Sequence, residues 1–134
     1  MSDVLMILLP VALGGGLGSV ARFLVAGVVE RRLGVAFPWG TLVVNVTGAC
    51  LIGILAALLL SPGDHSVLRP ALWLGFVIGV LGSYTTVSSF SLQTLALLRD
   101  GETGRALANV AASVLLCLAA AGLAMATTFA ATGG

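Results

Sequence analysis

Four long apolar stretches, separated by short connections, constrain this chain more than any other feature of its sequence. They cover residues 4–28, 37–60, 71–98 and 106–129. A helix needs about 20 residues to cross the hydrocarbon core of a bilayer, and each stretch is long enough. Backbone groups in lipid must be hydrogen-bonded within the protein, so each stretch is expected to be helical. The sequence therefore predicts an all-α membrane protein with one four-span transmembrane domain over residues 1–134.

The composition agrees with this class, because 59% of the residues are hydrophobic and only 8% are charged. We expect a multi-pass protein of the cell membrane, surrounded by membrane lipid. The formal net charge of +1 gives no basic surface for nucleic acid, so no nucleic-acid partner is expected. Asp3 stands where a signal peptide would carry basic residues, which predicts that the first span is retained.

Most of the charged residues lie in the predicted connections. We place Glu30, Arg31 and Arg32 in the first, Asp64, His65 and Arg69 in the second, and Arg99, Asp100, Glu102 and Arg105 in the third. Because the connections are short, successive spans are expected to be antiparallel neighbours. The first and third connections hold four arginines, against Arg69 alone on the other side, which predicts that both termini lie outside.

The third stretch contains a run of glycine, hydroxyl and aromatic residues from Gly82 to Ser91. Such a run within a membrane crossing predicts an interrupted helix. The interruption is costly unless the freed backbone groups are bonded within the protein, bind an ion or face a water-filled pore. We therefore expect an ion path at this position.

Two polar residues inside the other spans have more than one interpretation. Arg22 lies close enough to the end of span one to reach the interface, or it lines an aqueous vestibule and attracts anions. Asn45 shares a helical face with Thr41 and Gly48. Its amide either donates hydrogen bonds to an ion in a pore or holds two helices together.

Spacing of four residues recurs in the spans. Asn109, Ser113 and Cys117 form a polar stripe on span four, which fits either a polar track or serine bonded to its own backbone. Gly14 and Gly18 have the spacing that lets helix backbones pack closely.

Ordered motifs in three spans now resemble those of the Fluc, or CrcB, fluoride channels. They are GGGLGSVAR at 14–22, GTLVVNVTG at 40–48, and GF at 75–76 followed by GSYTTVSSFS at 82–91. The resemblance covers nearly the whole chain. It implies four helices with a broken third helix, assembled as an antiparallel dimer. It also implies a fluoride-specific channel that exports fluoride passively, lowers its cytoplasmic concentration and confers fluoride resistance.

The resemblance further implies roles for individual residues. Gly82 and Thr85 would offer backbone carbonyls to a structural sodium ion at the dimer centre. Asn45 would hydrogen-bond fluoride, and Phe90 would contact it in the pore. The remaining candidates for the polar track are Thr86, Ser88, Ser89 and Ser113. Arg22 would lie at a vestibule.

Three positions depart from the family pattern. Val87 stands where the first of two pore phenylalanines is expected, Gln93 replaces a frequent glutamate, and Asn109 replaces an aromatic hydroxyl. These departures, with the unequal arginine distribution, favour a heterodimer with a homologous subunit of opposite orientation. A homodimer is the simpler alternative, and a non-conducting or partner-dependent subunit is another.

Two further functional classes are disfavoured. A proton-coupled drug exporter needs a carboxylate within the membrane, and we place every Asp and Glu at a terminus or in a connection. An enzyme is not expected, because the sequence offers no nucleophile with a base, no carboxylate pair and no metal cluster.

Overall fold

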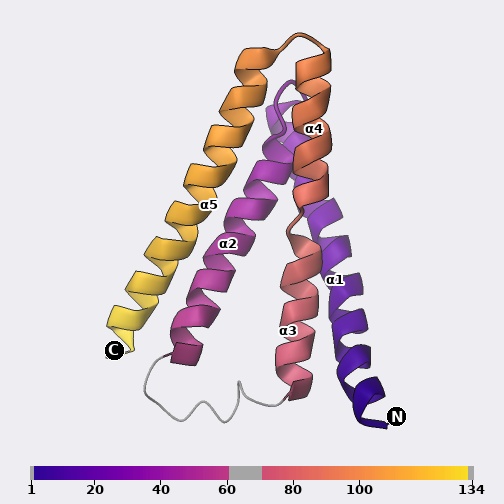
Figure 1. Cartoon of the computed structure of the whole chain (residues 1–134), viewed down its shortest axis with the longest axis vertical. Helices are drawn as coiled ribbons and strands as arrows, with labels where there is room; N and C mark the ends of the chain where they lie inside the picture. The colour runs from indigo at the N-terminus through magenta and orange to yellow at the C-terminus, as the bar shows by residue number, and fades with distance from the viewer. Residues whose placement is uncertain (1, 61–70, 133–134) are drawn as a thin grey trace.

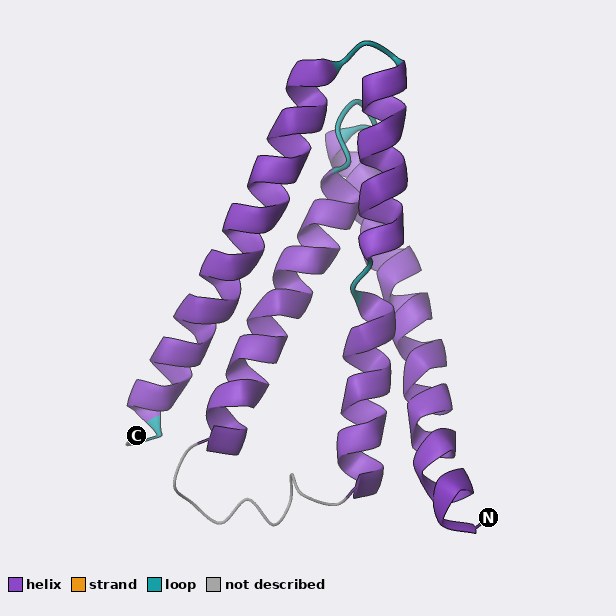
Figure 2. Cartoon of the chain, viewed as in Figure 1, coloured by secondary structure: helices purple, strands orange, loops and turns teal. Residues whose placement is uncertain are grey.

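The computed structural model describes residues 2–60 and 71–132, which form five helices (Figures 1 and 2). The helices are α1 (Ser2–Leu33), α2 (Trp39–Leu60), α3 (Ala71–Tyr84), α4 (Val87–Arg99) and α5 (Thr103–Ala131). The all-α class is therefore confirmed for the described part of the chain. The predicted second connection, with Asp64, His65 and Arg69, lies outside the described residues.

Three of the helices are long and apolar enough to cross a membrane. The qualifying segments are Leu8–Leu33, Trp39–Leu59 and Thr103–Ala131. The predicted third span is divided between α3, of 14 residues, and α4, of 13 residues. At about 1.5 Å per residue each is about 20 Å long, which is shorter than the roughly 30 Å of hydrocarbon in a bilayer.

The first predicted connection is wrong in part, because Glu30, Arg31 and Arg32 belong to α1. Charge does not end a helix, whereas a residue with positive φ does. Gly34 has a φ of +83° and donates its N–H to the carbonyl of Glu30 at 2.9 Å, so the chain leaves the helix there. Consequently Glu30 is a residue of a long helix rather than of a loop.

The third connection is also shorter than predicted. Arg99 is the last residue of α4 and Arg105 lies in α5, so only Asp100 to Glu102 connect the two helices. Gly101 turns the chain with a φ of +78°. Both this connection and residues 34–38 lie at the end of the molecule opposite the start of α1 and the end of α5 (Figure 1).

The most extensive helix contacts are between α1 and α3 and between α2 and α5. Glycines make these contacts possible. A Cβ on Gly18 would collide with the carbonyl oxygen of Val80, and a Cβ on Gly79 would collide with that of Val11. On the other pair, Gly53 packs in the same way against Ala121. The predicted close packing at Gly18 is thus confirmed.

The helix α4 is placed differently from α3. It contacts α5 and α2, but in the described residues it makes no close backbone contact with α1. The interruption at Thr85 and Thr86 therefore separates a half that packs on α1 from a half that packs on α5.

Large apolar side chains cover the outside of the helices. Phe23 is 78% exposed and Leu118 is 69% exposed, whereas few large apolar side chains of the described residues are buried. A surface of this kind is stable in lipid or against another apolar chain rather than in water. Together with the three long apolar helices, it identifies an integral membrane protein.

The glycine contact between α1 and α3 gives a first prediction. Gly18→Ala should destabilise the protein by about 1–3 kcal/mol, because the new methyl group forces the two backbones apart. The measurement is the midpoint of thermal unfolding in detergent. Gly16→Ala is the matched control, since no atom lies within 4 Å of a Cβ built there. Equal midpoints for the two variants would contradict the close contact.

Candidate functional site

The side-chain amide of Asn45 on α2 pairs with the backbone of Thr86 at the interruption. Its Nδ2 donates to the Thr86 carbonyl oxygen at 2.9 Å, and its Oδ1 accepts from the Thr86 N–H at 2.8 Å. The backbone groups fix the orientation of the amide, because the N–H only donates and the carbonyl only accepts. The backbone N–H of Thr86 is therefore bonded without a helical partner.

The interhelical role that the sequence left open for Asn45 is thus present in the structure. One turn along α2, Gly48 lies so close to Thr85 that a Cβ would collide with the threonine methyl group. The same face of α2 therefore holds both residues of the interruption. The pairing with Thr86 uses one of the two N–H groups of the Asn45 amide, which leaves the other for a further acceptor.

Thr86 also begins α4. It has an extended backbone with a φ of −152°, and its hydroxyl accepts from the N–H of Ser89 at 3.2 Å. This is the usual bonding of a helix N-cap. The Thr86 hydroxyl donates to Ser89 Oγ at 3.2 Å and lies 3.1 Å from Ser88 Oγ, which must then act as the donor. Three predicted track residues therefore form one hydrogen-bonded cluster.

The same hydrogen bonds free two backbone carbonyls. In a continuous helix the N–H groups of Thr86 and Ser89 would bond the carbonyls of Gly82 and Thr85, four residues earlier. Here these N–H groups bond Asn45 and the Thr86 hydroxyl instead. The two carbonyls so released are those that the family resemblance assigns to a sodium ion. Carbonyl oxygens suit sodium, so the residues present fit such an ion chemically.

A cavity of about 300 Å³ lies between α1, α2 and α4, and we call it the polar cavity. Its lining comprises Ser19, Arg22, Phe23, Ala26, Gly27, Glu30, Thr41, Val44, Thr86, Ser89 and Gln93. It lies between α1 and α4, whose backbones make no close contact. Arg22 makes no ion pair within the described residues, so its guanidinium adds positive charge to a lining that also holds the carboxylate of Glu30.

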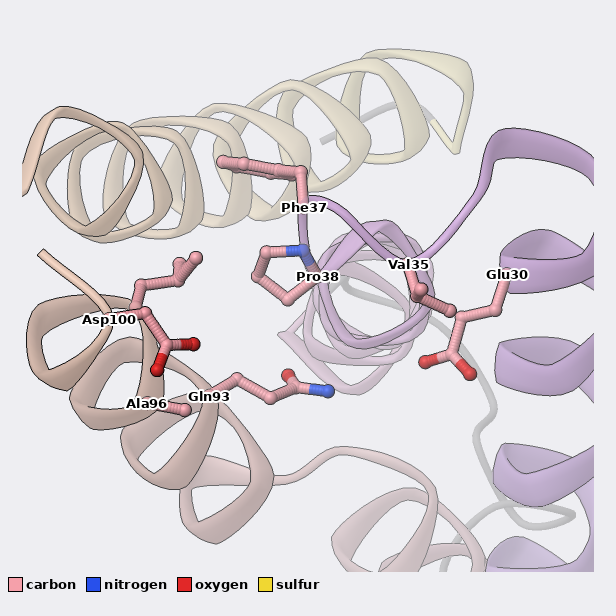
Figure 3. A pocket seen from close by; sticks show the side chains of 8 residues that line it. Glu30, Val35, Phe37, Pro38, Gln93, Ala96 and Asp100 are labelled. Atoms are coloured by element: carbon pink, nitrogen blue, oxygen red, sulfur yellow. The ribbon is translucent and has the colours of Figure 1, made fainter. Parts of the chain in front are cut away.

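A second cavity, of about 340 Å³, lies towards the end formed by the two connections (Figure 3). We call it the outer cavity. It is lined by Glu30, Val35, Phe37, Pro38, Gln93, Ala96, Leu97 and Asp100. Glu30 and Gln93 line both cavities. Neither residue was predicted to belong to the site, because Glu30 was placed in a connection and Gln93 was recognised only as a departure from the family pattern.

Phe90 and Ser113 line neither the polar cavity nor the outer cavity. The carbonyl of Phe90 accepts from Thr94 Oγ1 at 2.7 Å, and Thr94 in turn accepts from Asn109 Nδ2 at 2.9 Å. Asn109 is only 2% exposed, and Ser113 is also buried one turn further along α5. The polar stripe thus faces the protein interior, and its first member joins α5 to α4. Asn109 was visible in the sequence, but its partner Thr94 was not.

Comparison with known proteins agrees with the family resemblance of the sequence motifs. The family described as CrcB-like protein, Camphor Resistance (CrcB), matches residues 9–125. "Fluoride-specific ion channel FluC 2" of Bradyrhizobium diazoefficiens is 58% identical over 110 residues, 82% of this chain and 80% of the relative. The protein of the same name from Rhodopseudomonas palustris is 54% identical over 124 residues, covering 92% and 93% of the two chains. "Fluoride-specific ion channel FluC" of Opitutus terrae is 56% identical over 111 residues, covering 82% and 83%.

The Asn45–Thr86 pair gives a second prediction, about stability. Asn45→Leu keeps the size of the side chain but leaves the N–H of Thr86 without a partner, at a cost of about 1–3 kcal/mol. Thermal unfolding in detergent should therefore occur at a clearly lower temperature. Cys50→Ala, on the same helix and at a half-buried position, is the control and should change the midpoint much less. An Asn45→Leu midpoint equal to that of the control would show that the pair is not stabilising.

Proposed function

This chain belongs to the CrcB family, and we propose that it is a subunit of a fluoride-specific ion channel that lets fluoride leave the cell down its electrochemical gradient. The names of its relatives support the choice of ion. The observation in the structure that carries the proposal is the polar cavity, where Arg22 and several hydroxyl groups meet the interruption between α3 and α4. Passive export of this kind lowers cytoplasmic fluoride without ATP.

The chemistry of the polar cavity suits a small, strongly hydrated anion. A selective path must replace the water around fluoride with close donors. Arg22 supplies positive charge, and the hydroxyls of Thr41, Thr86 and Ser89 line the same space. The start of α4 also lies at Thr86, where a helix dipole favours negative charge. In this proposal the second N–H of Asn45, the Ser88 hydroxyl, the edge of Phe90 and the Ser113 hydroxyl continue the path.

In the membrane, α3 and α4 together form one broken crossing in this proposal. Their combined length is about 40 Å, which is sufficient for a bilayer although neither helix is sufficient alone. The interruption then lies near the middle of the membrane. The hydrogen bonds between Asn45 and Thr86 make this placement possible, because they satisfy backbone groups that lipid could not.

A structural sodium ion at the centre of a dimer is the second part of the proposal. Gly82 and Thr85 would hold it through the carbonyls whose usual N–H partners are diverted. The ion would supply positive charge that fixes these carbonyls. Gly82 is exposed, and no atom lies within 4 Å of a Cβ built on it, so its surface is open to a partner subunit.

The partner subunit is antiparallel, and it is either a second copy of this chain or a homologous subunit. Val87, in place of a pore phenylalanine, is 77% exposed at the start of α4. It is therefore available to a pore that draws residues from both subunits. If conduction requires two aromatic rings, this chain is the partner-dependent subunit of a heterodimer, which is the alternative form of the proposal.

The third prediction tests conduction directly. The purified chain in liposomes should release fluoride to an external electrode, whereas chloride release should stay at the level of protein-free liposomes. Fluoride flux without chloride flux would support a self-sufficient homodimer. No flux from folded, inserted protein, followed by flux on co-reconstitution with a homologous subunit, would support the heterodimer. No flux in either preparation would contradict the channel.

The fourth prediction concerns sodium. Replacing sodium with N-methylglucamine at equal ionic strength should lower the thermal unfolding midpoint of the dimer, because a ligand present at about 100 times its Kd stabilises by about 2.7 kcal/mol. Potassium at the same concentration is the control for a general cation effect. Identical midpoints in the three solutions would contradict a bound sodium ion.

A further inference from the structure

The polar cavity and the outer cavity meet at two residues. Glu30 of α1 and Gln93 of α4 are the residues that line both. Their side chains come from helices without close backbone contact, and in Figure 3 they point toward one another. The carboxylate and the amide therefore lie where the two cavities adjoin.

The carboxylate of Glu30 lies close to the start of α2. A Cβ built on Gly40, the second residue of that helix, would lie 2.8 Å from Glu30 Oε1. A negative charge at a helix N-terminus is favoured by the helix dipole. In the described part of the chain no hydrogen bond or ion pair joins this carboxylate to another side chain. Its charge thus acts on the passage without a neutralising partner.

Gln93 forms the opposite side of the passage. Its Oε1 is buried and has no hydrogen-bond partner, which is the single such side-chain atom among the described residues. A buried acceptor without a partner destabilises a protein unless water or a ligand bonds it. The amide can accept from a water molecule through Oε1 and donate to an anion through Nε2, so it is suited to an anion that still carries water.

We propose that Glu30 and Gln93 form the entrance through which fluoride reaches the polar cavity, and that the Glu30 carboxylate slows its passage. The inference rests on the proposed channel function. Fluoride meets the negative charge of Glu30 before the positive charge of Arg22, so the residues set its rate of access by opposing effects. Gln93 binds the partly hydrated ion between them. Glu30 and Gln93 therefore set the rate of conduction and do not determine the fold.

Neutralising Glu30 tests the electrostatic part. Glu30→Gln should increase the initial fluoride flux from liposomes about threefold at low ionic strength, because a repulsive charge is removed from the path. The increase should largely disappear in about 1 M salt, where screening acts over about 3 Å. Glu102→Gln is the control, since Glu102 is ion-paired with Arg105 at 3.2 Å and lines neither cavity.

Replacing Gln93 tests the other side of the passage. Gln93→Leu should lower fluoride flux severalfold, because the donor to the ion is lost. The same change should raise the thermal unfolding midpoint by roughly a few degrees, since the unpartnered oxygen is removed. A residue with a purely structural role would not combine lower flux with a higher midpoint.

The outcomes separate this inference from the proposed function. The experiments use whichever preparation conducts, the chain alone or with its homologous partner. The entrance alone would be overturned if the unmodified protein conducts but Glu30→Gln and Glu102→Gln give equal fluoride flux. A gain in flux in Glu30→Gln that persists in high salt would also overturn it. Unchanged flux in Gln93→Leu would do the same for the amide. Absence of flux in the unmodified protein would overturn the channel and the entrance together.

Discussion

The pairing of one side-chain amide with the backbone N–H and carbonyl of one residue organises this protein. A helix that stops inside a membrane exposes backbone groups that lipid cannot satisfy. Asn45 bonds both the N–H and the carbonyl of Thr86, and the Thr86 hydroxyl then bonds the N–H that begins α4. The chain can therefore stop and restart its helix within two residues. The carbonyls of Gly82 and Thr85 lose their helical partners as a direct result.

The change of packing partner at this interruption creates the space for the polar cavity. Before it, α3 packs on α1 through glycine contacts, and after it α4 packs on α5. The gap between α1 and α4 becomes the polar cavity, with Arg22 on one wall and the hydroxyls at the start of α4 on another. Structure and site thus have the same origin, because the residues that restart the helix also line the cavity.

Much of the fold was predictable, because apolar length and membrane thickness determine where long helices form. The interruption was predictable from its glycine and hydroxyl residues. The bond from Asn45 to Thr86 was not, since the residues are 41 positions apart and their meeting depends on how α2 packs. Glu30 was misplaced because charge was taken to mark a connection, whereas Gly34 ends the helix. The cavities could not be foreseen either, because they arise from the divergence of two helices.

The pairing order of the helices has a consequence for biosynthesis. The closest contacts join α1 to α3 and α2 to α5, so neither pair consists of helices adjacent in the chain. As the ribosome delivers the polypeptide, α1 is without its main partner until α3 has been made, and α2 is without its main partner until α5 has been made. The tight packing of α2 against α5 can therefore form only after α3 and α4 have been made.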